Sequence, residues 1–270
     1  MSITEDMRRS GMIEAAMTTG FEEPGDVLIV RMSFCKRQHS RQNIDIGPVW
    51  SCGPLRSWCE STDSATLVAQ GSLSKKAECL AIGTSMAAFV QSEQVPVLWA
   101  LQNSPKDEQV QTTPAQVLKY LTVQAPRLSF GGVSPQVSQA LNKTRISSAS
   151  TVEHWVALLS LALANVPIAY AVIDLDLFKS DDNTATTQLF FERLSELPKS
   201  CKPTLLKIAV VNKRRTAQID LMGISPAVIN LEKILQSRRG TPRRQYTPHR
   251  AGHGTRKGLF SLSMAVNKLS

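Results

Sequence analysis

The sequence predicts an α/β domain built on a mainly parallel β-sheet with helices on both faces. The clearest indication is the stretch over residues 168–176, a continuous apolar run that ends on the acidic residues Asp174 and Asp176. A run of this length and branching is typical of a strand buried on both faces, as in a parallel sheet covered by helices. The second indication is that strand-like and helix-like segments alternate along the chain, which implies parallel strands joined by right-handed crossovers.

The elements of the first half are expected in a simple order. Before Pro54 the pattern is weak, with a short helix expected near residues 12–18 and a strand near 26–32. From Pro54 onward the pattern predicts a short helix over 54–60, a strand over 65–71 closed by Gly71, a helix over 75–91 and a strand over 97–101.

The second half begins with clear helix signals. Thr113 as N-cap and Pro114 at the first helical position predict a helix that runs to about Gln124. Residues 128–150 are rich in Ser, Gly and Asn and are expected to be mostly loop, after which Thr151 caps another helix. The acidic strand is then followed by a helix that carries Leu189 to Leu197, a strand over 204–212 and a last helix over 225–237.

Composition predicts a globular protein with three parts. With 270 residues and 42% hydrophobic content, the chain can build one α/β domain over 54–237, an N-terminal extension over 1–53 and a tail over 238–270. The N-terminus does not resemble a secretory signal, and no apolar stretch approaches the roughly 20 residues of a membrane helix. We therefore expect an intracellular protein, cytoplasmic or nuclear, without membrane contact. The five cysteines and the pair His249 and His253 lack metal-site spacing, so no metal site is predicted.

The positive charge is concentrated at the C-terminal end. Nine of the 31 Lys and Arg residues follow Glu232, which is the last of the 22 acidic residues, so the segment after Glu232 accounts for the net charge of +9. Several Gly and Pro residues interrupt this segment, which should be flexible in isolation. Arg-rich segments of this kind bind nucleic acids through their phosphates, although a solvated tail is the alternative. The predicted polyanion-binding residues are Arg238, Arg239, Arg243, Arg244, Arg250, Arg256 and Lys257.

A phosphate-binding turn is the next candidate. In such a fold an anion binds at the first strand-to-helix turn, where backbone N–H groups and the helix dipole favour negative charge. Here the turn offers one glycine, two hydroxyls and two lysines, namely Gly71, Ser72, Ser74, Lys75 and Lys76. It departs from the motif G-x-x-x-x-G-K-[ST], because Lys76, Ala77 and Glu78 replace its last three positions. We therefore expect this turn to hold a phosphate poorly.

The acids after the long strand are the second half of this candidate site. An acid at the C-terminal end of a buried strand points into the crevice where α/β sheets bind ligands, and an Asp placed this way holds Mg²⁺ in P-loop NTPases. If the strand continues, Asp176 points to the same face as Asp174. The alternative is a core strand that ends in a solvated carboxylate.

The order of these segments resembles the NACHT-type P-loop NTPase domains common in filamentous fungi. The resemblance covers residues 54–212 and rests on the segments 55–60, 66–71, 97–101, 170–174 and 206–211. It implies that Asp174 is the Walker B acid, that Asn212, Arg214 or Arg215 senses a γ-phosphate, and that ATP or GTP with Mg²⁺ is the cofactor. Leu175 stands where the family has a second acid. With the altered turn, this departure argues against efficient hydrolysis.

The sequence therefore predicts a degenerate NTPase fold without catalytic residues. The leading interpretation is a non-catalytic or weakly nucleotide-binding regulatory or interaction protein with an unidentified protein partner. One alternative is a nucleic-acid-associated protein that binds through its basic tail. Another is a low-rate ATPase with an atypical phosphate-binding loop.

Overall fold

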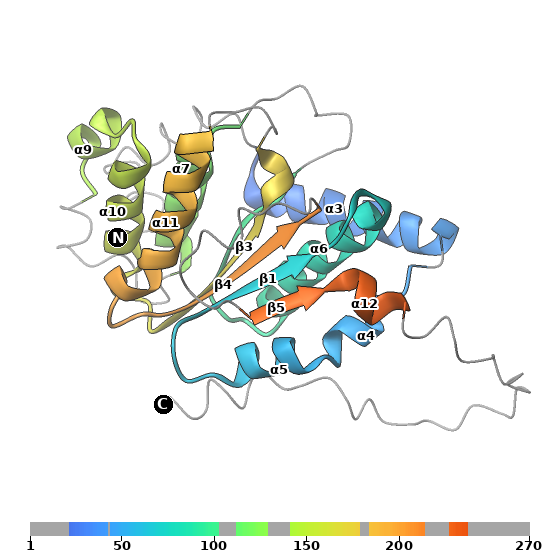
Figure 1. Cartoon of the computed structure of the whole chain (residues 1–270). Helices are drawn as coiled ribbons and strands as arrows, with labels where there is room; N and C mark the ends of the chain where they lie inside the picture. Colours follow the sequence, from blue (N-terminus) through green and yellow to red (C-terminus); the bar gives the residue numbers. More distant parts are fainter. Residues whose placement is uncertain are drawn as a thin grey trace, which may run out of the picture.

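Five parallel strands form the centre of the molecule (Figure 1). The computed structural model describes residues 22–42, 44–102, 112–128, 141–178, 184–213 and 227–236. Within these residues the strand order is β2-β3-β4-β1-β5, and every neighbouring pair is parallel. The predicted α/β fold with a parallel sheet is thus confirmed. The strands are β1 (Ala65–Gln70), β2 (Val97–Ala100), β3 (Ile168–Asp174), β4 (Leu205–Asn212) and β5 (Ala227–Asn230).

The register brings the ends of three strands together at one edge of the sheet. Gln70 pairs with Asn212 across β1 and β4, and Asp174 pairs with Val211 across β3 and β4. Gly71, which follows β1, therefore lies at the same edge as Asp174. This arrangement confirms the predicted placement of these two residues. Every residue of β3 is buried, as expected for a central strand covered on both faces.

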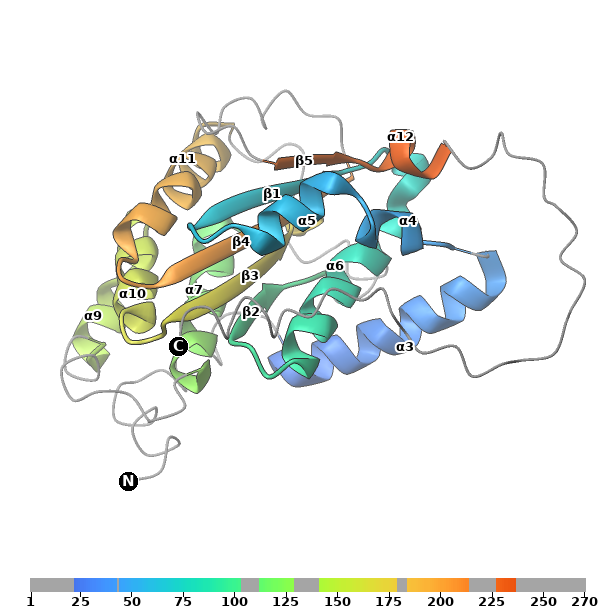
Figure 2. The same ribbon diagram turned by 90° about the horizontal axis from the view of Figure 1, so that it is seen from below.

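Helices cover both faces of the sheet (Figure 2). Alternate residues of β1 show the two cores, since Val68 belongs to one apolar cluster while Leu67 and Ala69 belong to the other. The Val68 side is covered by α7 (Pro114–Gln124), α10 (Val152–Leu163) and α11 (Thr184–Ser200). The opposite side is covered by α3 (Pro24–Gln42), α4 (Gly47–Trp50), α5 (Gly53–Glu60), α6 (Lys76–Ser92) and the short α12 (Leu231–Gln236).

The predicted helix starts on the Val68 side have the expected caps. The Thr113 side chain accepts a hydrogen bond from the Gln116 N–H, and the Gln116 side chain accepts one from the Thr113 N–H, which makes a full capping box. The Thr151 side chain likewise accepts from the His154 N–H at the start of α10. Residues 129–140 of the predicted loop over 128–150 lie outside the described residues. The prediction is wrong over 143–148, where Asn142 caps a short helix, α9 (Lys143–Ser148).

Three other predictions differ from the structure. Residues 26–32, expected as a strand, lie inside helix α3. The last helix, expected over 225–237, is replaced by strand β5 followed by α12. The long strand ends at Asp174, so Asp176 lies in the 3-10 turn η4 (Leu175–Leu177) instead of on the strand. The predicted helix over 12–18 lies outside the described residues.

A buried lysine ties the sheet to α5. Lys207 of β4 is only 1% exposed, and its Nζ donates hydrogen bonds to the carbonyl oxygens of Trp58 at 2.8 Å and Ser61 at 2.7 Å. These carbonyls belong to the C-terminal end of α5, where a cation satisfies acceptors that the helix leaves open. Burial is the main cause that lowers the pKa of Lys207 to about 8 from its ordinary value of 10.5.

Replacing Lys207 with methionine should destabilise the protein by about 1–3 kcal/mol, because buried carbonyl oxygens lose their donor. The pKa of Lys207 is lower in the folded state than in the unfolded chain. Between about pH 8 and 10.5 the folded protein has therefore lost this proton while the unfolded chain still holds it, so the free energy of unfolding of the wild type rises with pH in this range. Urea denaturation at pH 7 and pH 10 measures both effects. The gain should be missing from Lys207→Met and present in the control Lys199→Met, which changes an exposed lysine. Equal stability of wild type and Lys207→Met would contradict the capping role.

Candidate functional site

The turn after β1 is held by hydrogen bonds and an ion pair, one of them to the end of β4 and the others to neighbouring residues in the sequence. The Gly71 N–H donates to the Asn212 carbonyl at 2.9 Å, which continues the strand pairing by one residue. The hydroxyls of Ser72 and Ser74 lie 2.8 Å apart, and the 3-10 turn η1 (Leu73–Lys75) leads into α6. Lys75 Nζ lies 2.8 Å from Glu78 Oε1. The acid that stands in the metal-ligand position of the motif is thus engaged with a lysine of the same turn.

Gly71 is required at its position by close packing. A Cβ at residue 71 would lie 2.6 Å from Cys79 Sγ and 3.2 Å from Lys75 Cβ. The turn therefore approaches α6 more closely than any side chain permits. The lack of a side chain at residue 71 lets the turn pack directly against α6, and the turn does not open into a wide loop around a phosphate.

Replacing Gly71 with alanine should cost about 1–3 kcal/mol of stability, the usual penalty of overpacking. Adding Cys79→Ala should recover part of this loss, because it removes the sulfur that the new methyl group meets. Thermal or urea denaturation of the single and double variants tests this coupling. Gly53→Ala is the matched control, since a Cβ there meets nothing within 4 Å. If the losses of stability from Gly71→Ala and Cys79→Ala simply add, the clash between residue 71 and Cys79 Sγ is not the cause of the destabilisation.

The acids at the end of β3 are paired with two cations of the protein. Asp174 Oδ1 accepts a hydrogen bond from the Asp176 N–H at 3.1 Å. Asp174 Oδ2 lies 3.0 Å from Arg31 Nη2, which donates to it, and 3.6 Å from Lys213 Nζ. Lys213 Nζ also lies 2.5 Å from Asp176 Oδ2. We call these four residues, Arg31, Asp174, Asp176 and Lys213, the ion cluster.

The ion cluster is buried and balanced in charge. The side chains of Lys213, Arg31 and Asp174 are 0%, 2% and 3% exposed, and that of Asp176 is 15% exposed. Two carboxylates face two cations, so each buried charge has a counter-ion, as burial requires. Among the described residues, Arg31 Nε has no hydrogen-bond acceptor, whereas Lys213 Nζ is held by its ion pair with Asp176.

Cys79 lies beside the ion cluster but is poorly suited to act as a nucleophile. Burial raises the pKa of its thiol to about 12, against the opposing influence of Lys213. Only a thiolate is a strong nucleophile, and this thiol stays protonated at neutral pH. Cys79 therefore serves the packing of α6 against Gly71 and Asn212. None of the five cysteines is in a disulfide.

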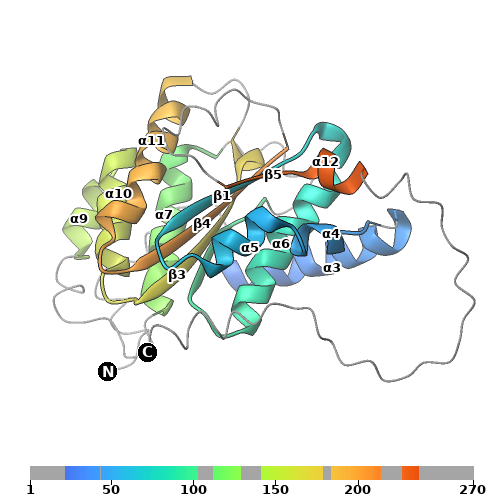
Figure 3. The same ribbon diagram turned by 60° about the horizontal axis from the view of Figure 1, so that its bottom comes forward.

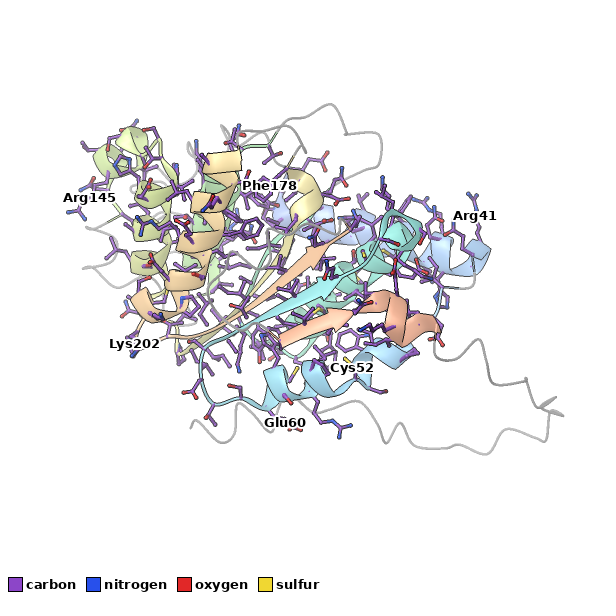
Figure 4. All side chains as sticks on the ribbon, viewed as in Figure 1. Arg41, Cys52, Glu60, Arg145, Phe178 and Lys202 are labelled. Atoms are coloured by element: carbon purple, nitrogen blue, oxygen red, sulfur yellow. The ribbon has the colours of Figure 1, made fainter. Side chains whose placement is uncertain are left out.

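The structure brings together most of the residues that the sequence analysis proposed. Gly71, Ser72, Ser74, Lys75 and Lys76 follow β1, while Asp174, Asp176 and Asn212 stand at or just beyond the ends of β3 and β4. Phe178, which directly follows η4 and is labelled in Figure 4, packs edge-on against Phe190 of α11 with ring centroids 5.1 Å apart. Arg214, Arg215 and the predicted polyanion-binding residues of the tail lie outside the described residues.

Sequence reasoning missed two members of the ion cluster. Lys213 directly follows Asn212 at the end of β4, so its position among the strand ends could have identified it. Arg31 was hidden because its segment was interpreted as a strand. Read as a helix, the same segment places Arg31 on one face with Val27 and Leu28, which are its buried neighbours.

Outside the ion cluster, the described residues offer few other chemical sites. They contain no group of three or more His, Cys, Asp or Glu that could hold a metal ion. A cavity of about 460 Å³ lies between the start of α3 and the start of β2, but no residue of the ion cluster lines it. No helix in the described ranges is long and apolar enough to cross a membrane. No known protein family, curated protein or solved structure matches the chain.

Proposed function

We propose that this protein contains a degenerate P-loop NTPase-like domain that is similar to the NACHT type. We propose further that it acts as a regulatory or interaction module and does not hydrolyse nucleotides. The observation that carries the proposal is the ion cluster. Asp174 stands where a metal-binding acid is expected, yet its carboxylate contacts Arg31 and Lys213. The protein's own cations take the place in which a divalent ion would be needed.

The position of the site in the sheet supports the P-loop-like part of the proposal. Strand β4 lies between β1, which leads into the glycine-containing turn, and β3, which ends in Asp174. Ligands of open α/β sheets bind at the carboxyl ends of the strands. A nucleotide in this domain would therefore lie beside Gly71 and Asp174.

The charges at this edge support the non-catalytic part. To bind Mg²⁺ through Asp174, the protein would have to separate two buried ion pairs. To bind phosphates through Lys75, it would have to break the 2.8 Å contact with Glu78 and leave that acid near the anion. Phosphoryl transfer needs a cradle, a metal and a positioned water together. The local charges oppose the first two of these requirements.

Exposed apolar side chains on α3 support the interaction part. Ile29, Val30 and Met32 are 64%, 50% and 49% exposed. The same helix also uses Val27 and Leu28 to pack on the domain. These exposed side chains offer apolar area to another protein.

The purified full chain should hydrolyse ATP and GTP far more slowly than the roughly 1 s⁻¹ that marks the low end of ordinary enzymes. Isothermal titration with each nucleotide should show weak or no binding, and Mg²⁺ should not strengthen it. Phosphate release and titration on the same preparation make the test. Turnover at enzyme-like rates that both Asp174→Asn and Lys75→Gln abolish would refute the proposal.

Nucleic-acid binding by the tail is the second candidate function. It is favoured by the concentration of cations after Glu232, where no acidic residue follows. A segment of this charge contacts phosphates with little sequence preference. The tail and the ion cluster are separate features, so either function can be tested without the other.

A further inference from the structure

We propose that the cavity beside strand β2 binds a short extended peptide of a partner protein, whose main chain pairs with Val97. The cavity has a volume of about 460 Å³, which is within the usual range of ligand pockets. It lies apart from the ion cluster. This inference therefore goes beyond the proposed function and does not depend on whether the domain binds a nucleotide.

Strand β2 has an open side. It stands at the edge of the sheet, where α7 contacts it from one face and α6 from the other, with α3 alongside α6 (Figures 2 and 3). The Tyr170 N–H donates to the Pro96 carbonyl at 2.9 Å, so Pro96 bonds toward β3. Successive residues of a strand direct their N–H and C=O groups alternately to either side. Val97 and Trp99 therefore direct theirs away from β3, toward the open edge.

The domain covers part of this edge with a side-chain amide. The Trp99 N–H donates to Gln124 Oε1 at 3.1 Å, and Gln124 Nε2 donates to the Trp99 carbonyl at 2.9 Å. One buried amide thus takes the place of a strand partner at Trp99. No described residue does the same for Val97, which is 5% exposed and lines the cavity. Because buried backbone groups are normally hydrogen-bonded, this position calls for a donor and an acceptor from a ligand.

The rest of the lining suits a ligand that is apolar and uncharged. Side chains of Pro24, Val95, Trp99 and Leu128 supply apolar surface. The two charged residues of the lining, Glu23 and Arg127, form an ion pair with each other. A charged ligand group would find its counter-ion already engaged. An internal stretch of a peptide meets these conditions, because its backbone is polar without carrying a charge.

The geometry of a strand edge identifies the polar part of the ligand as a main chain. The N–H and C=O of Val97 point to the same side, and a facing residue of an extended peptide presents the complementary C=O and N–H. Addition of a peptide to a sheet edge, with a pocket for its side chains, is a common mode of recognition. Gln124 occupies the edge at Trp99, so pairing is confined to the start of β2. We therefore expect a short segment and weak binding.

Titration of the isotope-labelled full chain with blocked pentapeptides tests the site by NMR. The probes are N-acetylated, C-amidated alanine pentapeptides with leucine, phenylalanine or alanine at the centre. Leucine or phenylalanine should bind more tightly than alanine and move the Val97 amide signal to lower field. N-methylation scanned along the tightest peptide should weaken binding at least about fivefold where the N–H faces Val97, and much less at the adjacent positions, whose N–H groups face away.

Two results of this titration would overturn the proposal. One is a Val97 signal that stays in place with every peptide up to its solubility limit. The other is an equal loss of affinity at every methylated position, because main-chain pairing requires alternation. The control probe is 3-methyl-1-butanol, which has the apolar branch of leucine but no amide. If it moves the Val97 signal as far as the leucine peptide does, the cavity is a simple apolar site and the proposal is wrong.

A matched pair of glycine variants tests the location of the site. Gly25 lines the cavity, Gly53 does not, and a Cβ at either position meets nothing within 4 Å. Gly25→Leu should weaken binding of the leucine peptide at least about tenfold by filling the cavity, while Gly53→Leu should bind as wild type does. Thermal melting of both variants checks that each is folded. Equal affinities of the two folded variants would overturn the site. Failure of the proposed function would appear instead as nucleotide turnover by the wild-type chain.

Discussion

Replacing Asp174 with asparagine should destabilise the protein by about 3–5 kcal/mol, a large part of the roughly 5–15 kcal/mol that holds a typical domain. Asp174 Oδ2 lies 3.0 Å from Arg31 and 3.6 Å from Lys213, both of which are buried. An amide in its place leaves two buried cations with the single carboxylate of Asp176. The loss is measured by urea denaturation at neutral pH.

The charge explanation predicts a specific double-mutant result. Arg31→Gln should also be strongly destabilising, but adding it to Asp174→Asn should cost much less than the sum, because Lys213 and Asp176 then remain as a balanced pair. Glu196→Gln is the surface control. Its partner Arg193 is 2.7 Å away, but both side chains are at least 40% exposed, so the change should stay within about 0.5 kcal/mol. Additive losses in the Asp174 and Arg31 cycle would show that the two residues act independently.

The sheet could be predicted from sequence because its strong signals are local. β3 is a run of apolar residues that is buried along its whole length, and such a run has few alternatives in a globular chain. Thr113 and Thr151 mark helix starts by their own hydrogen bonds, which depend on neighbours three residues away. Alternation of these elements then leaves few topologies other than a parallel sheet.

In two of the misassigned segments, residues 26–32 and strand β5, tertiary packing outweighs local preference. Residues 26–32 contain several β-branched and other apolar side chains, which favour a strand, but the segment continues as helix to Gln42 and leaves Ile29 and Val30 exposed. Strand β5 has four residues and lies at the sheet edge, where Val228 is 43% exposed. Such a short edge strand has no alternation long enough to separate it from the helix that follows.

Only those parts of the candidate site that lie at the C-terminal ends of strands could be predicted from the sequence. The turn after β1 and the acids after β3 follow from the parallel sheet, because successive strands end at one edge. The contact between Arg31 and Asp174 depends on how α3 packs on α6, and no local pattern reports that. The ion pair between Asp174 and Arg31 is therefore the feature of the site that required the structure.

Cutting the chain after Ser237 should remove most of its affinity for polyanions. The cut removes Arg238 through Lys268, the segment that carries nearly all of the net charge of +9. Binding to DNA or heparin at low salt should fall by a factor of about 10³ or more, and the steep salt dependence of the full chain should disappear with it.

The folded domain should survive this cut, because the sheet and the covering helices in the described part of the chain all end at or before Gln236. Heparin retention and thermal melting of the two chains, measured side by side, separate the outcomes. Retained binding would place the polyanion site on the remaining chain, with Lys75, Lys76, Arg214 and Arg215 as the first candidates. A lost melting transition would show instead that the removed segment stabilises the fold, and the charge on the tail would then have to be studied by replacing its arginines with glutamine in the full chain.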